Sequence, residues 1–96
     1  MKVMAIASFT PSFTPERLQP HMHSEVPATL KLYLEGKIEQ FWFRDKAGPI
    51  FLMNVESIEQ AKAALATLPL VKEQLFTYEL MPVGPLMPLG RLIQGQ

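Results

Sequence analysis

The sequence predicts one α+β domain whose elements follow the order strand, helix, strand, strand, helix, strand. A chain of 96 residues has room for a single hydrophobic core. Four of its segments are rich in the β-branched and aromatic residues that favour strands. The segment after the first strand and the segment before the last one each carry a helix-start signal and apolar residues at helical spacing.

The first strand is expected at residues 2–9, which are rich in strand-forming residues. A turn-forming cluster follows at residues 10–12. Because Pro11 in that cluster has no N–H to donate to a strand ladder, the strand is expected to end there.

The first helix is expected to begin near Pro15. Thr14 can cap the free N–H groups of the first turn, and proline is tolerated at the first helical position. Pro20 and Pro27 interrupt helical hydrogen bonding, so two short helices are conceivable. We favour one kinked helix ending before Gly36, which would take the left-handed conformation, because an apolar stripe keeps its phase across Pro27. The stripe consists of Leu18, Met22, Val26, Leu30, Tyr33 and Leu34.

The middle of the chain predicts a β-hairpin. Residues 37–44 and 49–55 are rich in strand-forming residues, and the polar segment 45–48 between them ends in glycine.

The second helix and the last strand follow the hairpin. Ser57 with Gln60 three residues later is a capping box, and the apolar spacing continues to about Leu68. Residues 74–81 are expected to form the last strand, and Pro82 is expected to end it.

The predicted domain covers residues 1–83, and residues 84–96 form a Pro/Gly-rich tail. The tail is nevertheless apolar, and its apolar side chains would be costly to leave in water. We therefore expect it to pack on a partner subunit.

Composition excludes several classes of partner. Lys plus Arg and Asp plus Glu number nine each, so no net charge attracts nucleic acid or an anionic membrane surface. No apolar run approaches the roughly 18 residues that a membrane span needs. The chain has no cysteine, which excludes disulfides and thiolate metal sites and fits a cytoplasmic location.

A cavity is expected on the sheet face that the helices leave bare. Two right-handed crossovers place both helices on one face of the sheet. Since 48% of the chain is hydrophobic, we expect a ferredoxin-like domain that pairs sheet to sheet with a second copy as a dimeric α+β barrel. The purely apolar alternate positions should face the helices: Phe41, Phe43, Phe76, Tyr78 and Leu80. By elimination, the mixed positions should point into the cavity: Gln40, Trp42, Arg44, Thr77 and Glu79, with Asn54 from the third strand.

Residues 36–42, 54–57, 68–70 and 78–82 resemble the muconolactone isomerase family. The resemblance covers roughly the C-terminal two thirds of the chain. It implies a small dimeric α+β barrel, often assembled into larger rings, that moves the double bond of an unsaturated lactone acid without a cofactor.

The chemistry of a proton shift next to a carbonyl suggests roles for two residues of the cavity. Such a reaction needs a group that takes and returns a proton and a group that holds negative charge. Glu79 could be the base beside Trp42, while Arg44 could hold a substrate carboxylate. The alternative is that Arg44 and Glu79 form an ion pair with each other, or ion pairs at the dimer seam, and that Trp42 belongs to the core.

His21 and His23 do not predict a metal site. A spacing of two on a helix turns them roughly 200° apart, so one ion cannot take both. His21 with Glu25 could handle protons or contact substrate at the cavity rim, and a solvated helix pair is the alternative.

Three functions are therefore weighed. The first is a cofactor-independent isomerase of a small unsaturated carboxylate or lactone. The second is a non-catalytic ligand-binding or oligomerising protein on the same scaffold. The third is a cofactor-free monooxygenase of the antibiotic-biosynthesis type. Nucleotide binding has no support, because the chain carries no glycine-rich phosphate loop.

Overall fold

A computed structural model describes residues 1–84 of the chain, so the expected partner-bound tail lies outside the described residues apart from Gly84. The elements along the chain are β1 (Lys2–Phe9), α1 (Pro15–Leu18), the 3₁₀ helix η1 (Gln19–His21), α2 (Met22–Leu34), β2 (Ile38–Arg44), β3 (Gly48–Asn54), α3 (Ile58–Leu65), α4 (Pro69–Lys72) and β4 (Phe76–Val83).

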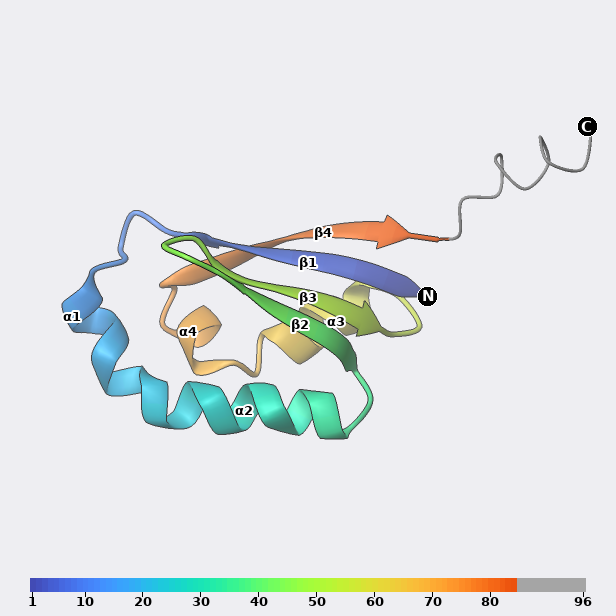
Figure 1. Cartoon of the computed structure of the whole chain (residues 1–96), viewed down its shortest axis with the longest axis horizontal. Helices are drawn as coiled ribbons and strands as arrows, with labels where there is room; N and C mark the ends of the chain where they lie inside the picture. The colour runs from blue at the N-terminus through green and yellow to red at the C-terminus, as the bar shows by residue number, and fades with distance from the viewer. Residues whose placement is uncertain (85–96) are drawn as a thin grey trace, which may run out of the picture.

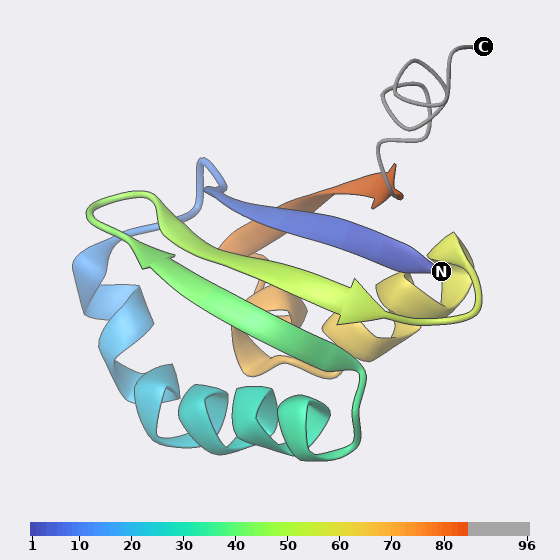
Figure 2. The ribbon, with the colours of Figure 1, turned by 45° about the vertical axis from the view of Figure 1, so that its right-hand side comes forward.

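The four strands form one antiparallel sheet in the order β2-β3-β1-β4. The helices all lie on one face of this sheet (Figure 1, Figure 2). The expected α+β class with a four-stranded antiparallel sheet is confirmed, and the topology is compatible with a ferredoxin-like domain.

The first helical region is broken where Pro20 stands. Thr14 caps α1 as expected, its hydroxyl accepting from the Arg17 N–H at 3.1 Å. Pro20 lies in the first turn of η1, where its missing N–H costs little, and α2 then runs through Pro27 without interruption. Because Pro27 is exposed, water can bond the carbonyl that its ring leaves unpaired. The prediction of one kinked helix was therefore wrong in detail, because α1, η1 and α2 divide the region near Pro20, whereas Gly36 has the expected positive φ of 80°.

The buried face of α2 differs from the predicted stripe. Val26 is 58% exposed, Leu30 48% and Leu34 75%, whereas Glu25 and Leu32 are buried. The helix turns the Glu25 side toward the sheet, so most of the apolar stripe lies along the edge of the domain. The stripe does not form the core.

The second helical region also ends earlier than expected. The Ser57 hydroxyl accepts from the Gln60 N–H at 3.1 Å, which confirms the cap. The helix stops at Leu65, and Leu68 takes an extended conformation because Pro69 follows it. The short helix α4, which begins at Pro69, has no counterpart among the predicted elements.

Strand β4 continues through Pro82, contrary to the prediction that this proline ends it. Pro82 pairs with Val3 of β1, and within residues 1–84 no strand pairs with the other side of β4. An edge strand tolerates proline because the missing N–H can face outward.

The hydrophobic core lies between the sheet and the helices. Strand β1 contributes Val3, Ala5 and Ala7, each at most 1% exposed, and β3 contributes Phe51 and Met53. The core also contains Leu32 of α2, Ala61, Ala64 and Leu65 of α3, and Leu68.

Candidate functional site

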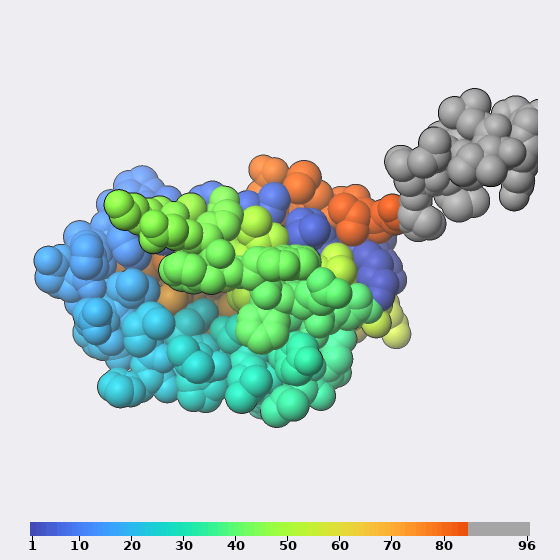
Figure 3. Space-filling view, viewed as in Figure 1, coloured from blue at the N-terminus to red at the C-terminus, as the bar shows by residue number. Residues whose placement is uncertain are grey.

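An apolar pocket of about 610 Å³ opens between α2 and the β2–β3 side of the sheet. The surface is hollowed between the cyan helix and the green hairpin (Figure 3). The exposed apolar stripe of α2 supplies one wall, with Met22, Val26 and Leu30. The opposite wall is aromatic, with Phe41 and Phe43 of β2, Phe51 of β3 and Phe76 of β4.

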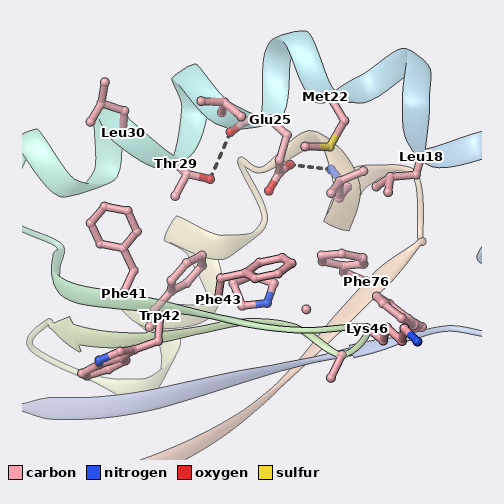
Figure 4. Close-up of a pocket in the computed structure, with 17 residues that line it drawn as sticks. Leu18, Met22, Glu25, Thr29, Leu30, Phe41, Trp42, Phe43, Lys46 and Phe76 are labelled. Carbon is pink, nitrogen blue, oxygen red and sulfur yellow. Dashed lines mark hydrogen bonds between the residues drawn. The ribbon is translucent and has the colours of Figure 1, made fainter. Parts of the chain in front are cut away.

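Strand register explains why these aromatic rings line the pocket. Phe41 pairs with the buried Phe51, and directly paired residues point to the same face of a sheet. The rings of Phe41 and Phe43 rise toward α2, while Trp42 between them points the other way (Figure 4). Because β2 is an edge strand, Phe43 stays 80% exposed at the pocket's side.

Glu25 is the one acidic side chain of the described residues that is buried, with 7% of its surface exposed. Its Oε1 accepts from the Leu70 N–H at 2.9 Å, near the start of α4 (Figure 4). Burial raises the pKa of this carboxyl above its usual value of 4.5, and the Leu70 N–H, the Thr29 hydroxyl and the charge of His21 oppose that rise. An acid with a raised pKa in an apolar pocket is a common feature of functional sites.

The Tyr78 hydroxyl is buried and has no hydrogen-bond partner among residues 1–84. Burial, and then the charge of Glu25, raise the pKa of this phenol. Its ring stacks on Phe51, with the two ring centroids 5.6 Å apart. Most buried hydroxyl groups have a hydrogen-bond partner, so Tyr78 is an exception among the described residues.

The predicted cavity residues share the open face of the sheet, opposite the helices. Trp42 pairs with Ile50, Glu79 with Ile6, and Thr77 with Ser8. Gln40 pairs with Leu52 on the same face. Trp42 is 45% exposed there in the single chain. The predicted facing of Phe76, Tyr78 and Leu80 toward the helices agrees with this register.

A β-bulge changes one position of that pattern. The register shifts between Ile38 and Gln40, so Ile38 faces the core at 1% exposure although it is two residues from Gln40. The extra residue, Glu39, forms an ion pair with Lys2.

Within residues 1–84 the Arg44 guanidinium binds backbone carbonyl oxygens and does not bind a carboxylate. Its guanidinium donates to the carbonyl oxygens of Ala7 at 2.5 Å, Ala47 at 2.9 Å and Gly48 at 3.1 Å. The ion pairs of residues 1–84 join Lys2 to Glu39 and Lys37 to Glu35, so the alternative pairing of Arg44 with Glu79 is absent there.

The two remaining predicted site residues lie apart from the pocket. Asn54 is exposed at the end of β3. His21 lines a separate small groove with Arg17 and Glu73. Within residues 1–84 no three His, Cys, Asp or Glu side chains are grouped closely enough to hold a metal ion.

The sequence predicted Glu25 only as a partner of His21. The signal that could have identified it is its spacing from Ala28 and Leu32, which is that of one helix face. A glutamate on such a face is rarely buried without a partner, and the partner of Glu25 is the Leu70 N–H.

The fold and the pocket define a small α+β domain with a buried carboxyl group beside an apolar cavity. No protein-family model matches the chain, and no curated protein matches it. The resemblance to the muconolactone isomerase family therefore stays a prediction. None of the helices in residues 1–84 is long and apolar enough to cross a membrane.

Proposed function

We propose that the protein is a small cofactor-independent enzyme that isomerises an unsaturated lactone or carboxylate by proton transfer. The observation that supports it is the buried Glu25 carboxyl at the wall of the apolar pocket. In this proposal Glu25, and not the exposed Glu79, exchanges the proton.

The reaction moves one proton and one double bond. The Glu25 carboxylate takes a proton from the α carbon of a β,γ-unsaturated lactone, and the C–H electron pair forms an enolate whose charge lies on the carbonyl oxygen. Glu25 then returns the proton to the γ carbon, which leaves the double bond conjugated with the carbonyl. The raised pKa of Glu25 suits this task. It makes the carboxylate a stronger base, and it lets the protonated form, which returns the proton, exist closer to neutral pH.

The finer fold belongs to the same proposal: a ferredoxin-like domain that pairs sheet to sheet with a second copy. The open face supports it, because the helices leave that face uncovered while it carries apolar side chains from all four strands of residues 1–84. These side chains are Met4, Ile6, Ile50, Leu52 and Met81, together with Trp42.

Two adjacent substitutions test the pairing. Trp42 and Phe43 are both exposed on β2 but point to opposite faces. Trp42→Glu is expected to shift the protein from dimer to monomer in sedimentation velocity, whereas Phe43→Glu is expected to leave the dimer intact. A wild-type monomer, or equal effects of the two substitutions, contradicts sheet-to-sheet pairing.

A non-catalytic ligand-binding protein is the second candidate. It is favoured by the Leu70 N–H, which already satisfies one oxygen of Glu25 and so gives the carboxyl a structural role. Binding without turnover would then be the whole function.

Deuterium exchange separates the two candidates. The probe is α-angelica lactone in D₂O, with NMR following deuterium incorporation and the shift of the double bond. Glu25→Gln is expected to lower the rate by about a hundredfold or more, the range for loss of a general base. Glu59→Gln, an exposed carboxyl on α3, is the matched control and is expected to retain the rate.

The outcomes are distinct. Loss of exchange in Glu79→Gln with retention in Glu25→Gln would move the base to the open sheet face. Binding of the lactone without any exchange by the wild type would favour the ligand-binding protein, and oxygen consumption would favour the monooxygenase.

A further inference from the structure

We propose that the pocket under α2 takes an uncharged, largely apolar ring compound whose single polar end is a carbonyl oxygen bound by Glu25. This inference rests on the proposed function, because it concerns the same pocket. It narrows the substrate class from carboxylates and lactones to neutral carbonyl compounds, and it extends that class to compounds larger than a single small ring.

The size of the pocket supports the larger ligand. A cavity of about 610 Å³ lies in the middle of the range that encloses drug-sized molecules. Its walls are aromatic rings on the sheet side and flexible aliphatic chains on the α2 side, a combination suited to a flat ring system.

The charges of the lining residues support an uncharged ligand. The lining contains three side chains with strongly polar groups, those of Glu25, Thr29 and Lys46. The Thr29 hydroxyl already donates to the Glu25 backbone carbonyl at 3.0 Å. Lys46 lies in the exposed turn between β2 and β3, so the cation of the site is at the rim. An anion placed against the apolar walls would lose its hydration without gaining a counter-charge.

The orientation of Glu25 supports a carbonyl at the inner end. Oε1 accepts from the Leu70 N–H, and the second carboxyl oxygen points toward the sheet (Figure 4). In the protonated form that second oxygen can donate to a ligand carbonyl. Only the protonated acid makes this contact, whereas taking a proton from carbon needs the ionised carboxylate.

A matched pair of ligands tests the class. Naphthyl methyl ketone and the naphthoate of the same ring position have nearly the same shape and differ in charge. Calorimetric titration of the full chain at neutral pH is expected to show the ketone binding at least about tenfold more tightly. Equal or tighter binding of naphthoate overturns the inference.

A matched pair of variants places the ligand in this pocket. Val26 and Leu34 are both exposed on α2, but only Val26 lines the pocket. Val26→Glu is expected to weaken ketone binding by about tenfold or more, and Leu34→Glu by less than about twofold. Equal effects of the two substitutions would place the ketone elsewhere and overturn the inference.

Glu25→Gln separates this inference from the proposed function. Its amide oxygen can still accept from Leu70, and its NH₂ group can still donate to the ketone, but it cannot exchange a proton. Retained ketone binding with lost deuterium exchange supports both proposals. Retained binding with unchanged exchange refutes the catalytic role of Glu25 and leaves the ligand class standing. Loss of ketone binding in a variant whose circular dichroism and melting temperature match the wild type overturns the orientation.

Discussion

Replacing Glu25 by glutamine is expected to make the protein more stable than the wild type as the pH rises. Burial raises the pKa of this carboxyl above 4.5, so the folded state binds its proton more tightly than the unfolded state does. The stabilisation from that proton is fully present below the unfolded pKa and is lost as the pH rises through the folded pKa. Glutamine carries no such proton, so its contribution to the free energy of unfolding does not change with pH.

The magnitude follows from one hydrogen bond and one proton. Below the unfolded pKa both side chains are neutral and both accept from the Leu70 N–H, so the two free energies of unfolding should agree within about 1 kcal/mol. Above it the difference should grow by at most about 1.4 kcal/mol per pH unit, the slope for one proton, and level off above the folded pKa.

Urea unfolding of both proteins over a pH series measures this difference directly. Glu25→Ala is the second variant, because it leaves the Leu70 N–H without an acceptor and should cost about 1–3 kcal/mol relative to Glu25→Gln at every pH. A difference between wild type and Glu25→Gln that stays constant with pH would refute the claim that the folded chain desolvates this carboxyl.

Two further predictions concern the same region. Gly48→Ala should destabilise the domain by about 1–3 kcal/mol more than Gly36→Ala, because both glycines have positive φ but only a Cβ at Gly48 would meet another atom, the Ala7 Cβ at 3.2 Å. Equal midpoints in urea would contradict the close approach of the hairpin to β1. Tyr78→Phe should leave the free energy of unfolding unchanged or raise it by up to about 1 kcal/mol, because the hydroxyl it removes is buried without a partner. A loss of more than about 1 kcal/mol in thermal unfolding would reveal a hydrogen bond from that hydroxyl.

Sequence rules predicted the elements correctly where a residue caps a helix or sets a backbone dihedral angle within its own segment. Thr14 and Ser57 cap the helices that follow them, and Gly36 takes the left-handed conformation after α2. The prediction failed at Pro82 because the effect of a proline depends on whether its strand has one neighbour or two. That is a property of the sheet and is not visible in the segment itself.

The candidate site was predicted on the face opposite the pocket, and of its residues Trp42 alone also borders the pocket. The alternation along β2 correctly placed Trp42 and Phe43 on opposite faces of the sheet. The site was predicted on the face that carries both polar and apolar side chains, because the polar groups lie there. In the structure the pocket lies on the apolar face, between Phe43 and the stripe of α2. Glu79 remains a candidate whose role the deuterium exchange experiment decides.

The amino-acid sequence predicted the α+β class, the start of each helical region and the two faces of each strand, because these depend on dihedral preferences and on spacing within one segment. The tertiary structure decided which side of α2 meets the sheet. That rotation buries Glu25 against α4, leaves Val26 and Leu30 beside an empty volume, and so creates the pocket. The apolar stripe and the Glu25 face are neighbouring sides of one helix, so residue spacing alone does not tell which of them faces the sheet. The packing of all the helices against the sheet sets the rotation of α2.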